Sequence, residues 1–265
     1  MIRYSIIIPC FNSERYLSHI LRFIHITHTI RDDIEFIIIN DGSTDMTDDI
    51  LSTQSGIIYI KQINKGVSAS RNVGIKSANG HYLLFLDADD SFDDNIFNIL
   101  DEAISLDDKE TDLIFFNYST NNIPNKNNIL RKKTYSNNEV LHLILTHKVK
   151  FHICSICFKK EFIQNQNLKF PENYKFGEDI YFILSSLITT EKHIYYIDKP
   201  LFNYNWNNSS TVKSPITKNK IDVIELYNFL EGNSKINNKN LVKDIVYFKQ
   251  RTFFYLLKLS IKFKA

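Results

Sequence analysis

Short apolar runs alternate with helical periodicities along the first half of the chain. Runs rich in β-branched and aromatic residues predict buried strands at 5–8, 35–39, 57–60, 82–86 and 113–118. Apolar residues three and four apart predict helices between these strands, beginning near Glu14, Ser68 and Asp94. Strands that alternate with helices form right-handed βαβ units and a mostly parallel sheet. The pattern therefore predicts an α/β fold.

The second half of the chain has a less regular pattern. The segment 121–138 is rich in Asn and Lys and predicts a polar surface loop, and a second loop is expected at 170–179. Helical spacing continues at 138–147 and again after residue 179. Apolar runs predict further strands at 151–158 and 194–204.

Residues 241–264 predict one long helix that is apolar nearly all round. This helix carries six basic residues against a single acid, Asp244. One interpretation is a helix packed on the domain, with lysines that reach across apolar surface to water. The other is an interfacial helix drawn to anionic lipid. The sequence leaves both interpretations open.

Composition narrows the range of functions. The formal net charge of +2 on 265 residues is too small to indicate nucleic acid as a partner. The three cysteines suggest no disulfide framework and fit a reducing compartment. No apolar stretch reaches the roughly 20 residues needed to cross a bilayer. We therefore expect a cytoplasmic protein, and the oligomeric state is open.

Acidic side chains follow two of the predicted strands. Asp41 follows the second strand, and Asp87, Asp89 and Asp90 follow the fourth. Ligands of open α/β sheets bind at the edge where parallel strands end, so these acids should converge on one site. Clustered carboxylates with room for water suit Mg²⁺ or Mn²⁺, which commonly bind through one or two carboxylates plus substrate phosphates.

Four fragments lie at the ends of the predicted strands. They are Pro9-Cys10-Phe11-Asn12 followed by Glu14; Asn40-Asp41-Gly42-Ser43; Asn64, Gly66, Ser68, Arg71, Asn72 and Gly74; and Asp87-Ala88-Asp89. Together they resemble motifs of the inverting glycosyltransferases with the GT-A fold, often called family 2. The resemblance covers about 6–90, with a second patch at Glu178-Asp179. It implies a Rossmann-like, mostly parallel sheet flanked by helices, with a C-terminal helical extension.

We expect a catalytic domain at 1–212, in which 1–118 binds the nucleotide-sugar and 119–212 binds the acceptor. The segment 213–265 would be helical and is a candidate for attachment to a membrane surface. The residues assigned to the nucleotide-sugar are Pro9, Phe11, Asn12, Glu14, Asp41, Asn64, Gly66, Ser68, Arg71, Asp87, Ala88 and Asp89.

A uridine ring needs an apolar floor, which Pro9 and Phe11 offer, and a polar partner for its edge. By resemblance, Asp41 takes the base N–H, and either Glu14 or Asp87 holds the ribose hydroxyls. An ordinary turn with a helix cap is the structural alternative for Asp41, but the accompanying motifs favour the nucleotide role.

Two further roles concern the donor's phosphates. Arg71 can form a bidentate pair with a phosphate or with a carboxylate, and a surface salt bridge is the structural alternative. Asp89, with Asp87 in support, would bind Mn²⁺ or Mg²⁺ across both phosphates. That ion would neutralise the charge that develops on the departing diphosphate.

Glu178 and Asp179 lie at a predicted helix start, where acids often have no role other than a favourable interaction with the helix dipole. The resemblance places a catalytic base here. Asp179 is the expected base, deprotonating the acceptor hydroxyl, and Glu178 is the alternative. A single displacement would invert the anomeric centre.

Two positions depart from the family pattern. Asn40 replaces the first acid of the second motif, although an amide can still accept a hydrogen bond. Asn205 stands where an Arg often follows Tyr204, which puts phosphate contacts from that segment in doubt. Trp206 beside it could stack on an acceptor sugar or anchor packing.

Two patterns that contain cysteine are weaker evidence of a functional site. His152, Cys154 and Cys157 could suggest zinc, but there is no second Cys pair and the run is typical of a buried strand. Cys10 has no visible base partner and is expected to be a small apolar filler.

The leading hypothesis is a metal-dependent inverting transferase that uses a UDP-sugar, such as UDP-glucose or UDP-galactose. Its acceptor would be a saccharide, or one linked to polyprenyl diphosphate, in synthesis of bacterial surface polysaccharide such as lipopolysaccharide O-antigen or capsule. The chain would then sit peripherally on the inner face of the plasma membrane. The alternatives are a nucleotidyltransferase and a non-catalytic, membrane-associated nucleotide-sugar-binding protein.

Overall fold

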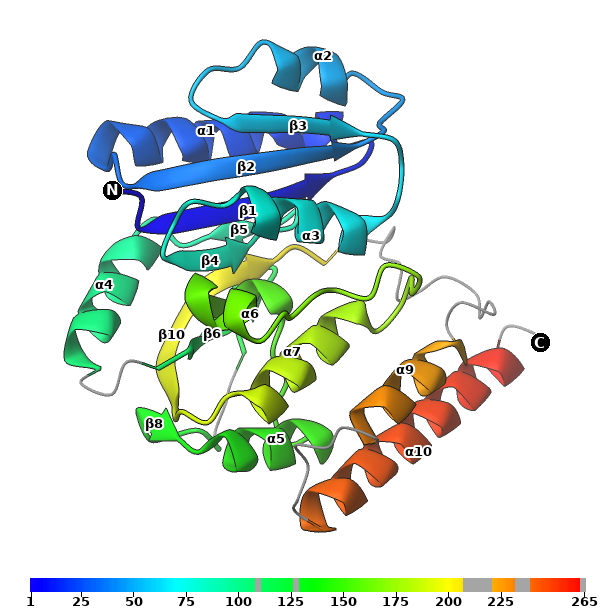
Figure 1. Cartoon of the computed structure of the whole chain (residues 1–265). Helices are drawn as coiled ribbons and strands as arrows, with labels where there is room; N and C mark the ends of the chain where they lie inside the picture. Colours follow the sequence, from blue (N-terminus) through cyan, green and yellow to red (C-terminus); the bar gives the residue numbers. More distant parts are fainter. Residues whose placement is uncertain (108–110, 126–128, 207–220, 232–238, 263–265) are drawn as a thin grey trace.

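A computed structural model describes residues 1–107, 111–125, 129–206, 221–231 and 239–262 (Figure 1). In this part of the chain the strands form one sheet. They are β1 (Tyr4–Cys10), β2 (Ile34–Asp41), β3 (Ile58–Gln62), β4 (Tyr82–Phe85), β5 (Ser91–Phe92), β6 (Leu113–Thr120), β7 (Ile123–Pro124), β8 (Thr134–Tyr135), β9 (Ile156–Lys159) and β10 (Ile194–Tyr204).

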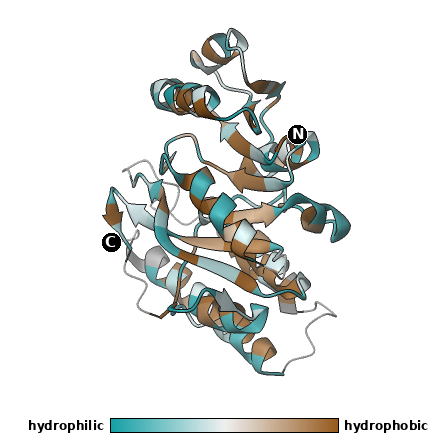
Figure 2. Cartoon of the chain, turned by 90° about the vertical axis from the view of Figure 1, so that its left-hand side faces the viewer, coloured by the Kyte–Doolittle hydropathy of each residue, from teal (hydrophilic) through white to brown (hydrophobic). Residues whose placement is uncertain are grey.

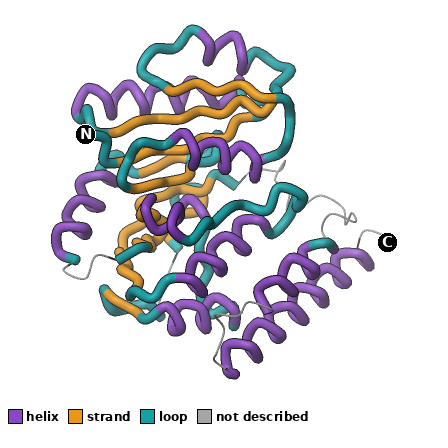
Figure 3. The backbone as a smooth tube through the Cα atoms, in the orientation of Figure 1, coloured by secondary structure: helices purple, strands orange, loops and turns teal. Residues whose placement is uncertain are grey.

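Helices cover both faces of this sheet, as Figure 3 shows by colour. They are α1 (Glu14–Ile30), α2 (Thr47–Ser52), α3 (Val67–Ser77), α4 (Ile96–Leu106), α5 (Asn137–Leu145), the 3₁₀ turn η1 (Ile153–Ser155), α6 (Lys160–Asn165), α7 (Glu178–Thr189), α9 (Val223–Glu231) and α10 (Lys239–Lys262). Apolar residues concentrate in the strands and on the inner helix faces (Figure 2).

The strand order is β3-β2-β1-β4-β9-β6-β10-β5. The first four strands of this order are parallel, and so is the β6–β10 pair. β9 joins both β4 and β6 in the antiparallel sense. The expected α/β fold with a C-terminal helical extension is confirmed, and the sheet becomes mixed where β9 enters it.

The chain order creates a crevice between β1 and β4. From β1 the chain moves outward to β2, and from β3 it returns past β1 to β4. Right-handed crossovers in these opposite directions place α1 and α3 on opposite faces of the sheet (Figure 1). Such a switch point is where open α/β sheets bind ligands.

The long apolar runs correspond to strands buried on both faces. All eight residues of β2 are buried, as expected for an interior parallel strand. β1 continues through Pro9, which lies opposite Ile39, and ends at Cys10. The strand therefore extends two residues beyond the range of 5–8 expected from the sequence.

The expected strand at 151–158 is wrong in its first half. Residues 153–155 form η1, and only β9 is extended. The hydroxyl of Ser155 donates to the carbonyl of His152 at 2.7 Å, and His152 N–H donates back to this hydroxyl at 3.0 Å. This reciprocal pair closes a tight turn that an apolar run does not reveal.

The C-terminal helices pack against α5 and α7. On α10 the buried side chains are Leu241, Ile245, Phe248 and Leu256, while Tyr247, Phe253, Phe254, Tyr255 and Leu257 are exposed. Packing on the domain is thus confirmed for one face, and attachment to a membrane stays a prediction. The boundary expected at 212/213 lies outside the described residues. Among the described helices, none combines the length and hydropathy of a transmembrane span.

Gly74 sets how closely α3 approaches the sheet. A Cβ at this position would lie 2.3 Å from Ile7 Cγ2. Gly→Ala within a helix normally stabilises by up to about 1 kcal/mol, but overpacking typically costs about 1–3 kcal/mol. We expect Gly74→Ala to lower the free energy of unfolding by about 1–2 kcal/mol, measured by urea denaturation.

The matched control is Lys76→Ala, two residues further on the exposed face of the same helix. It should change the free energy of unfolding by less than about 0.5 kcal/mol. Equal or greater stability of Gly74→Ala would show that β1 and α3 are not in close contact.

Candidate active site

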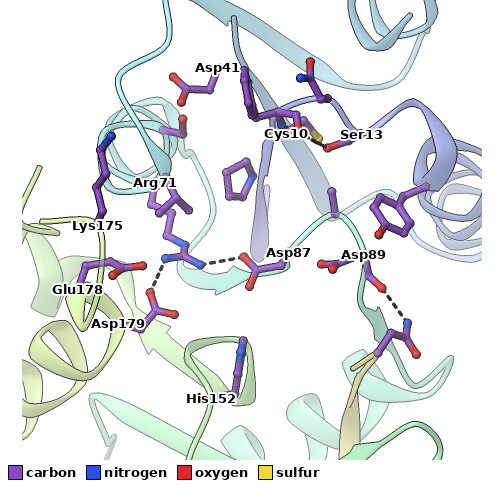
Figure 4. Close-up of a pocket in the computed structure, with 18 of the residues that line it drawn as sticks. Cys10, Ser13, Asp41, Arg71, Asp87, Asp89, His152, Lys175, Glu178 and Asp179 are labelled. Atoms are coloured by element: carbon purple, nitrogen blue, oxygen red, sulfur yellow. Dashed lines mark hydrogen bonds and ion pairs between the residues drawn. The ribbon is translucent and has the colours of Figure 1, made fainter. Parts of the chain in front are cut away.

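A cavity of about 540 Å³ opens at the edge where β1, β2 and β4 end. Figure 4 shows side chains from these strand ends on one side and from the start of α7 on the other. Of the residues expected from the sequence, the cavity is lined by Pro9, Phe11, Asn12, Asp41, Arg71, Asp87, Ala88, Asp89, Glu178 and Asp179. The convergence of separate strand ends brings these groups together.

Arg71 lies at the centre of the site and is only 2 % exposed. One guanidinium nitrogen donates to Asp87 at 2.8 Å, and the other donates to Asp179. Arg71 therefore pairs with carboxylates in a buried position, not on the surface. Burial is the largest influence on the pKa of Asp87 and acts to raise it, but the charge and hydrogen bond of Arg71, added to those of other neighbours, leave that pKa below its usual value.

An aromatic stack supports the guanidinium. Arg71 lies over the ring of Phe170, with 5.2 Å between its central carbon and the ring centroid. Phe170 in turn stacks on Phe182 of α7, with 4.0 Å between the ring centroids. Asn72 fixes the backbone of Phe170 through two hydrogen bonds of 2.9 Å. The Arg-Asn pair of the third motif thus anchors the segment that leads to α7.

Asp41 is buried and holds the turn before α3. Its carboxylate accepts from the backbone N–H groups of Lys65 and Gly66 at 2.9 and 2.7 Å, and from Gln62. Position 66 requires glycine, because its φ of +90° is rarely adopted by residues with a side chain. The structure places Asn64, Gly66 and Ser68 in or beside this turn, outside the cavity lining.

The turn after β1 is tied to the turn after β2. Asn12 accepts from Thr44 N–H at 2.8 Å, and Glu14 accepts from Met46 N–H at 2.9 Å. Glu14 therefore faces a backbone amide and does not line the cavity. Asn40 accepts from Ser43 N–H at 2.9 Å and donates to Asp48 at 3.3 Å. A carboxylate at position 40 would instead repel Asp48.

Asn205 holds the loop that carries the acids. Its backbone N–H donates to Asp90 at 2.7 Å, and its side-chain amide donates to the carbonyl of Asp89 at 2.8 Å. Burial and the charges of Asp87 and Asp89 raise the pKa of Asp90 to about 8. Where the family pattern has Arg, this chain therefore has a neutral amide that orients the acidic loop.

The Glu178-Asp179 pair begins α7 after Gly177, whose φ is +82°. Burial and the neighbouring charge of Asp179 raise the pKa of Glu178 to about 7. Helix α9 packs directly behind this turn, because a Cβ on Gly177 would lie 2.2 Å from Val223 Cγ2. The C-terminal segment therefore helps to position the acids.

Several lining residues were not expected from the sequence, among them Arg15, Tyr16, Ser70, His152, Lys175 and Tyr204. Arg15 and Tyr16 follow Asn12 closely, and Lys175 precedes Glu178, so proximity to motifs was the available signal. Trp206 is 52 % exposed. It lies outside the lining, with its backbone N–H donating to Asn121.

A family model described as Glycosyl transferase family 2 matches residues 5–165. The chain belongs to glycosyl transferase family 2. The minor teichoic acid biosynthesis protein GgaB of Bacillus subtilis (strain 168) is 32 % identical over 251 residues, which cover 84 % of this chain. The chain spans 27 % of the length of GgaB.

Two solved structures have a fold similar to that of this chain and superimpose on nearly all of it. The crystal structure of S. aureus TarS 1–349 in complex with UDP-GlcNAc has a TM-score of 0.78 and 18 % identity, and the match covers 96 % of this chain and 73 % of TarS 1–349. The mannosyltransferase PcManGT from Pyrobaculum calidifontis, in complex with GDP-Man and Mn²⁺, has a TM-score of 0.64 and 14 % identity, covering 98 % of this chain and 73 % of PcManGT. These likenesses confirm the GT-A fold.

The raised pKa of Glu178 predicts how stability depends on pH. Because the pKa rises from 4.5 to about 7 on folding, the folded state binds more protons than the unfolded state between these values. Stability is therefore lost as pH rises through this window. Glu178→Gln removes the charged form. We therefore expect the free energy of unfolding of the variant, relative to that of the wild type, to increase by about 2 kcal/mol between pH 4.5 and pH 8.

Thermal unfolding of both proteins over this pH range measures the difference. Glu191→Gln, which changes an exposed acid two residues after α7, is the matched control and should have the same pH dependence of stability as the wild type. A difference between Glu178→Gln and the wild type that stays constant with pH would contradict the raised pKa.

Proposed function

We propose that this chain transfers a sugar from a UDP-sugar to a hydroxyl of a saccharide acceptor, with inversion, in synthesis of a bacterial cell-surface glycan. The observation that carries the proposal is the shared Arg71, which joins Asp87 at the end of β4 to Asp179 at the start of α7 across one cavity. This arrangement brings the acids proposed to hold the donor within reach of the acid proposed to act on the acceptor.

Membership in the family, together with the similar proteins, supports a UDP-sugar donor and a role in synthesis of a cell-surface glycan. GgaB is named for teichoic acid biosynthesis, and the TarS structure contains UDP-GlcNAc. Phe11 is 51 % exposed at the cavity mouth beside Pro9, so both can contact a planar base. Asp41 keeps acceptor capacity for a base N–H, because two carboxylate oxygens offer about four lone-pair sites and three are used.

The acid loop fits a divalent ion. Asp89 is half-buried in the cavity lining, whereas Asp87 is engaged by Arg71. We therefore assign Asp89 as the direct ligand, with Asp87 in support. Oxygen donors of this kind suit Mn²⁺ or Mg²⁺, and PcManGT is complexed with Mn²⁺. When bound, the ion supplies Lewis-acid stabilisation of the leaving diphosphate.

Asp179 is proposed as the general base. Its carboxylate accepts from Arg71 at the cavity edge, facing Asp87 in Figure 4. Arg71 fixes one oxygen, and the other oxygen can accept the proton of an acceptor hydroxyl. Glu178, whose pKa is raised to about 7, is the alternative, because a base with a pKa near the working pH is efficient.

The acceptor's location is the least constrained part of the proposal. The exposed aromatic residues of α10 lie beside exposed Arg251 and Lys258. Such a face is typical of helices that bind anionic membrane surfaces. It supports a lipid-linked acceptor at a membrane, and the sugar that is transferred stays open.

Asp89→Ala tests the metal role. The substitution removes the proposed ligand from a loop that other contacts hold in place, so we expect the Mn²⁺-dependent part of UDP affinity to be lost. Isothermal titration of UDP with and without Mn²⁺ measures it. Asp94→Ala, an exposed acid five residues further on, should bind UDP as the wild type does. Unchanged Mn²⁺-dependent affinity in Asp89→Ala would remove the metal role.

Asp179→Asn tests the base. The amide oxygen can still accept from Arg71, so UDP affinity should be unchanged while turnover falls by about 10²–10⁴-fold. UDP release in the presence of Mn²⁺ from UDP-glucose, UDP-galactose and UDP-GlcNAc measures turnover and selects the donor. Glu178→Gln is the matched comparison. If Glu178→Gln loses turnover and Asp179→Asn keeps it, Glu178 is the base.

A further inference from the structure

Four side chains with metal-binding atoms meet at the wall of the cavity, which two of them line. They are Asp87, Asp90, His152 and Cys154, and their candidate ligand atoms all lie within 4.8 Å of one another. Figure 4 shows His152 below Asp87, on the side of the cavity opposite Asp41. The group thus combines nitrogen, sulfur and oxygen donors at one point.

The pairing of β4 with β9 brings together the segments that carry these residues. β9 runs antiparallel to β4 with Tyr82 opposite Lys159 and Leu83 opposite Phe158. The turn η1, which precedes β9 and contains Cys154, contacts β4, and Asp87 follows β4 by two residues. The backbone therefore places Cys154 near Asp87.

The imidazole of His152 is held in place by its surroundings. Its ring stacks on Phe202 with 5.0 Å between the centroids and lies 5.3 Å from Tyr204. Nδ1 accepts a hydrogen bond of 3.3 Å from Cys154 N–H, which is long enough to be exchanged for a bond to a metal. A rigid ligand of this kind loses little entropy on binding.

Asp90 supplies an independent sign of a missing partner. Its side chain is 1 % exposed, and one carboxylate oxygen accepts from Asn205 N–H. The other oxygen, Oδ2, is buried without a hydrogen-bond partner among the described residues. Buried carboxylate oxygens are normally paired, because desolvation without a partner is costly. A cation held between Asp90 and Asp87 would satisfy this oxygen.

We propose that Asp87, Asp90, His152 and Cys154 form a site for a soft divalent transition metal of the zinc class. Zinc is bound tetrahedrally by thiolate, imidazole and carboxylate, and thiolate ligands select against Mg²⁺ and Mn²⁺. The ligand atoms of such a site lie about 3.3–3.8 Å apart, given ordinary bond lengths. The present separations require a contraction of about 1 Å, which small side-chain rotations supply.

This site differs from the one assigned to the donor's metal ion, although the two share Asp87. A zinc-class ion would draw Asp87 away from Arg71, which also holds Asp179. Such an ion should therefore inhibit sugar transfer, a consequence that rests on the proposed function. The existence of the site does not, because binding can be measured without turnover.

Cobalt(II) titration of the full chain tests the site in the absence of any nucleotide. Co²⁺ occupies zinc sites and reports a thiolate ligand through charge-transfer absorption in the near ultraviolet. We expect one Co²⁺ per chain with this absorption, displaced by one equivalent of Zn²⁺. Cys154→Ser should abolish the absorption, and His152→Ala should weaken Co²⁺ binding by at least about tenfold.

Cys157→Ser and Cys10→Ser are matched controls, since both remaining cysteines are also buried. Both variants should keep the charge-transfer absorption. Melting temperatures without metal identify any variant that fails to fold. If Cys154→Ser does not fold, His152→Ala tests the site in its place. Absence of the absorption in the wild type, or its persistence in Cys154→Ser, would overturn the proposal. If only Asp89→Ala removed Co²⁺ binding, the proposal would also be overturned, and the assignment of Asp89 to the donor's metal ion would stand.

Discussion

The site depends on one buried cation. Arg71 is permanently charged, and its side chain is almost fully withdrawn from water. Removing one partner from such a pair typically costs about 3–5 kcal/mol, because a buried charge is then left uncompensated. Asp87 and Asp179 supply the compensation from positions 16 and 108 residues away in the sequence. The end of β4 and the start of α7 are therefore joined by an electrostatic requirement.

Other elements pack so that this arrangement is maintained. Asn72 and Phe182 hold Phe170 under the guanidinium. Asn205, which directly follows β10, holds the acidic loop. From the C-terminal segment, α9 presses on the turn at Gly177. The helices after residue 220 therefore belong to the site as supports, whatever surface α10 contacts on its outer face.

Much of this fold could be predicted because interior parallel strands must be apolar on both faces. β2, in which every residue is buried, contains a continuous apolar run at 36–39. The strand-end motifs located the part of the lining that the sheet contributes, since sheet topology makes such ends converge. Neither signal contains information on pairing across long sequence separations. The partners of Arg71, and the role of Glu14 as acceptor for Met46 N–H, required the structure. The turn at η1 was missed because its residues have the composition of a strand.

The two departures from the family motif pattern show how charge is balanced in the cavity. Asn40 and Asn205 both donate hydrogen bonds that hold acidic segments, and neither adds a charge. The charged side chains that line the cavity are Asp41, Asp87, Asp89, Glu178 and Asp179 against Arg15, Arg71 and Lys175. Arg71 is already shared between two of these acids, and Arg15 and Lys175 are outnumbered by the five acids, so the lining as a whole is unfavourable to an incoming diphosphate. A divalent cation on Asp89 is the simplest way to admit such an anion, which strengthens the case for metal-dependent donor binding.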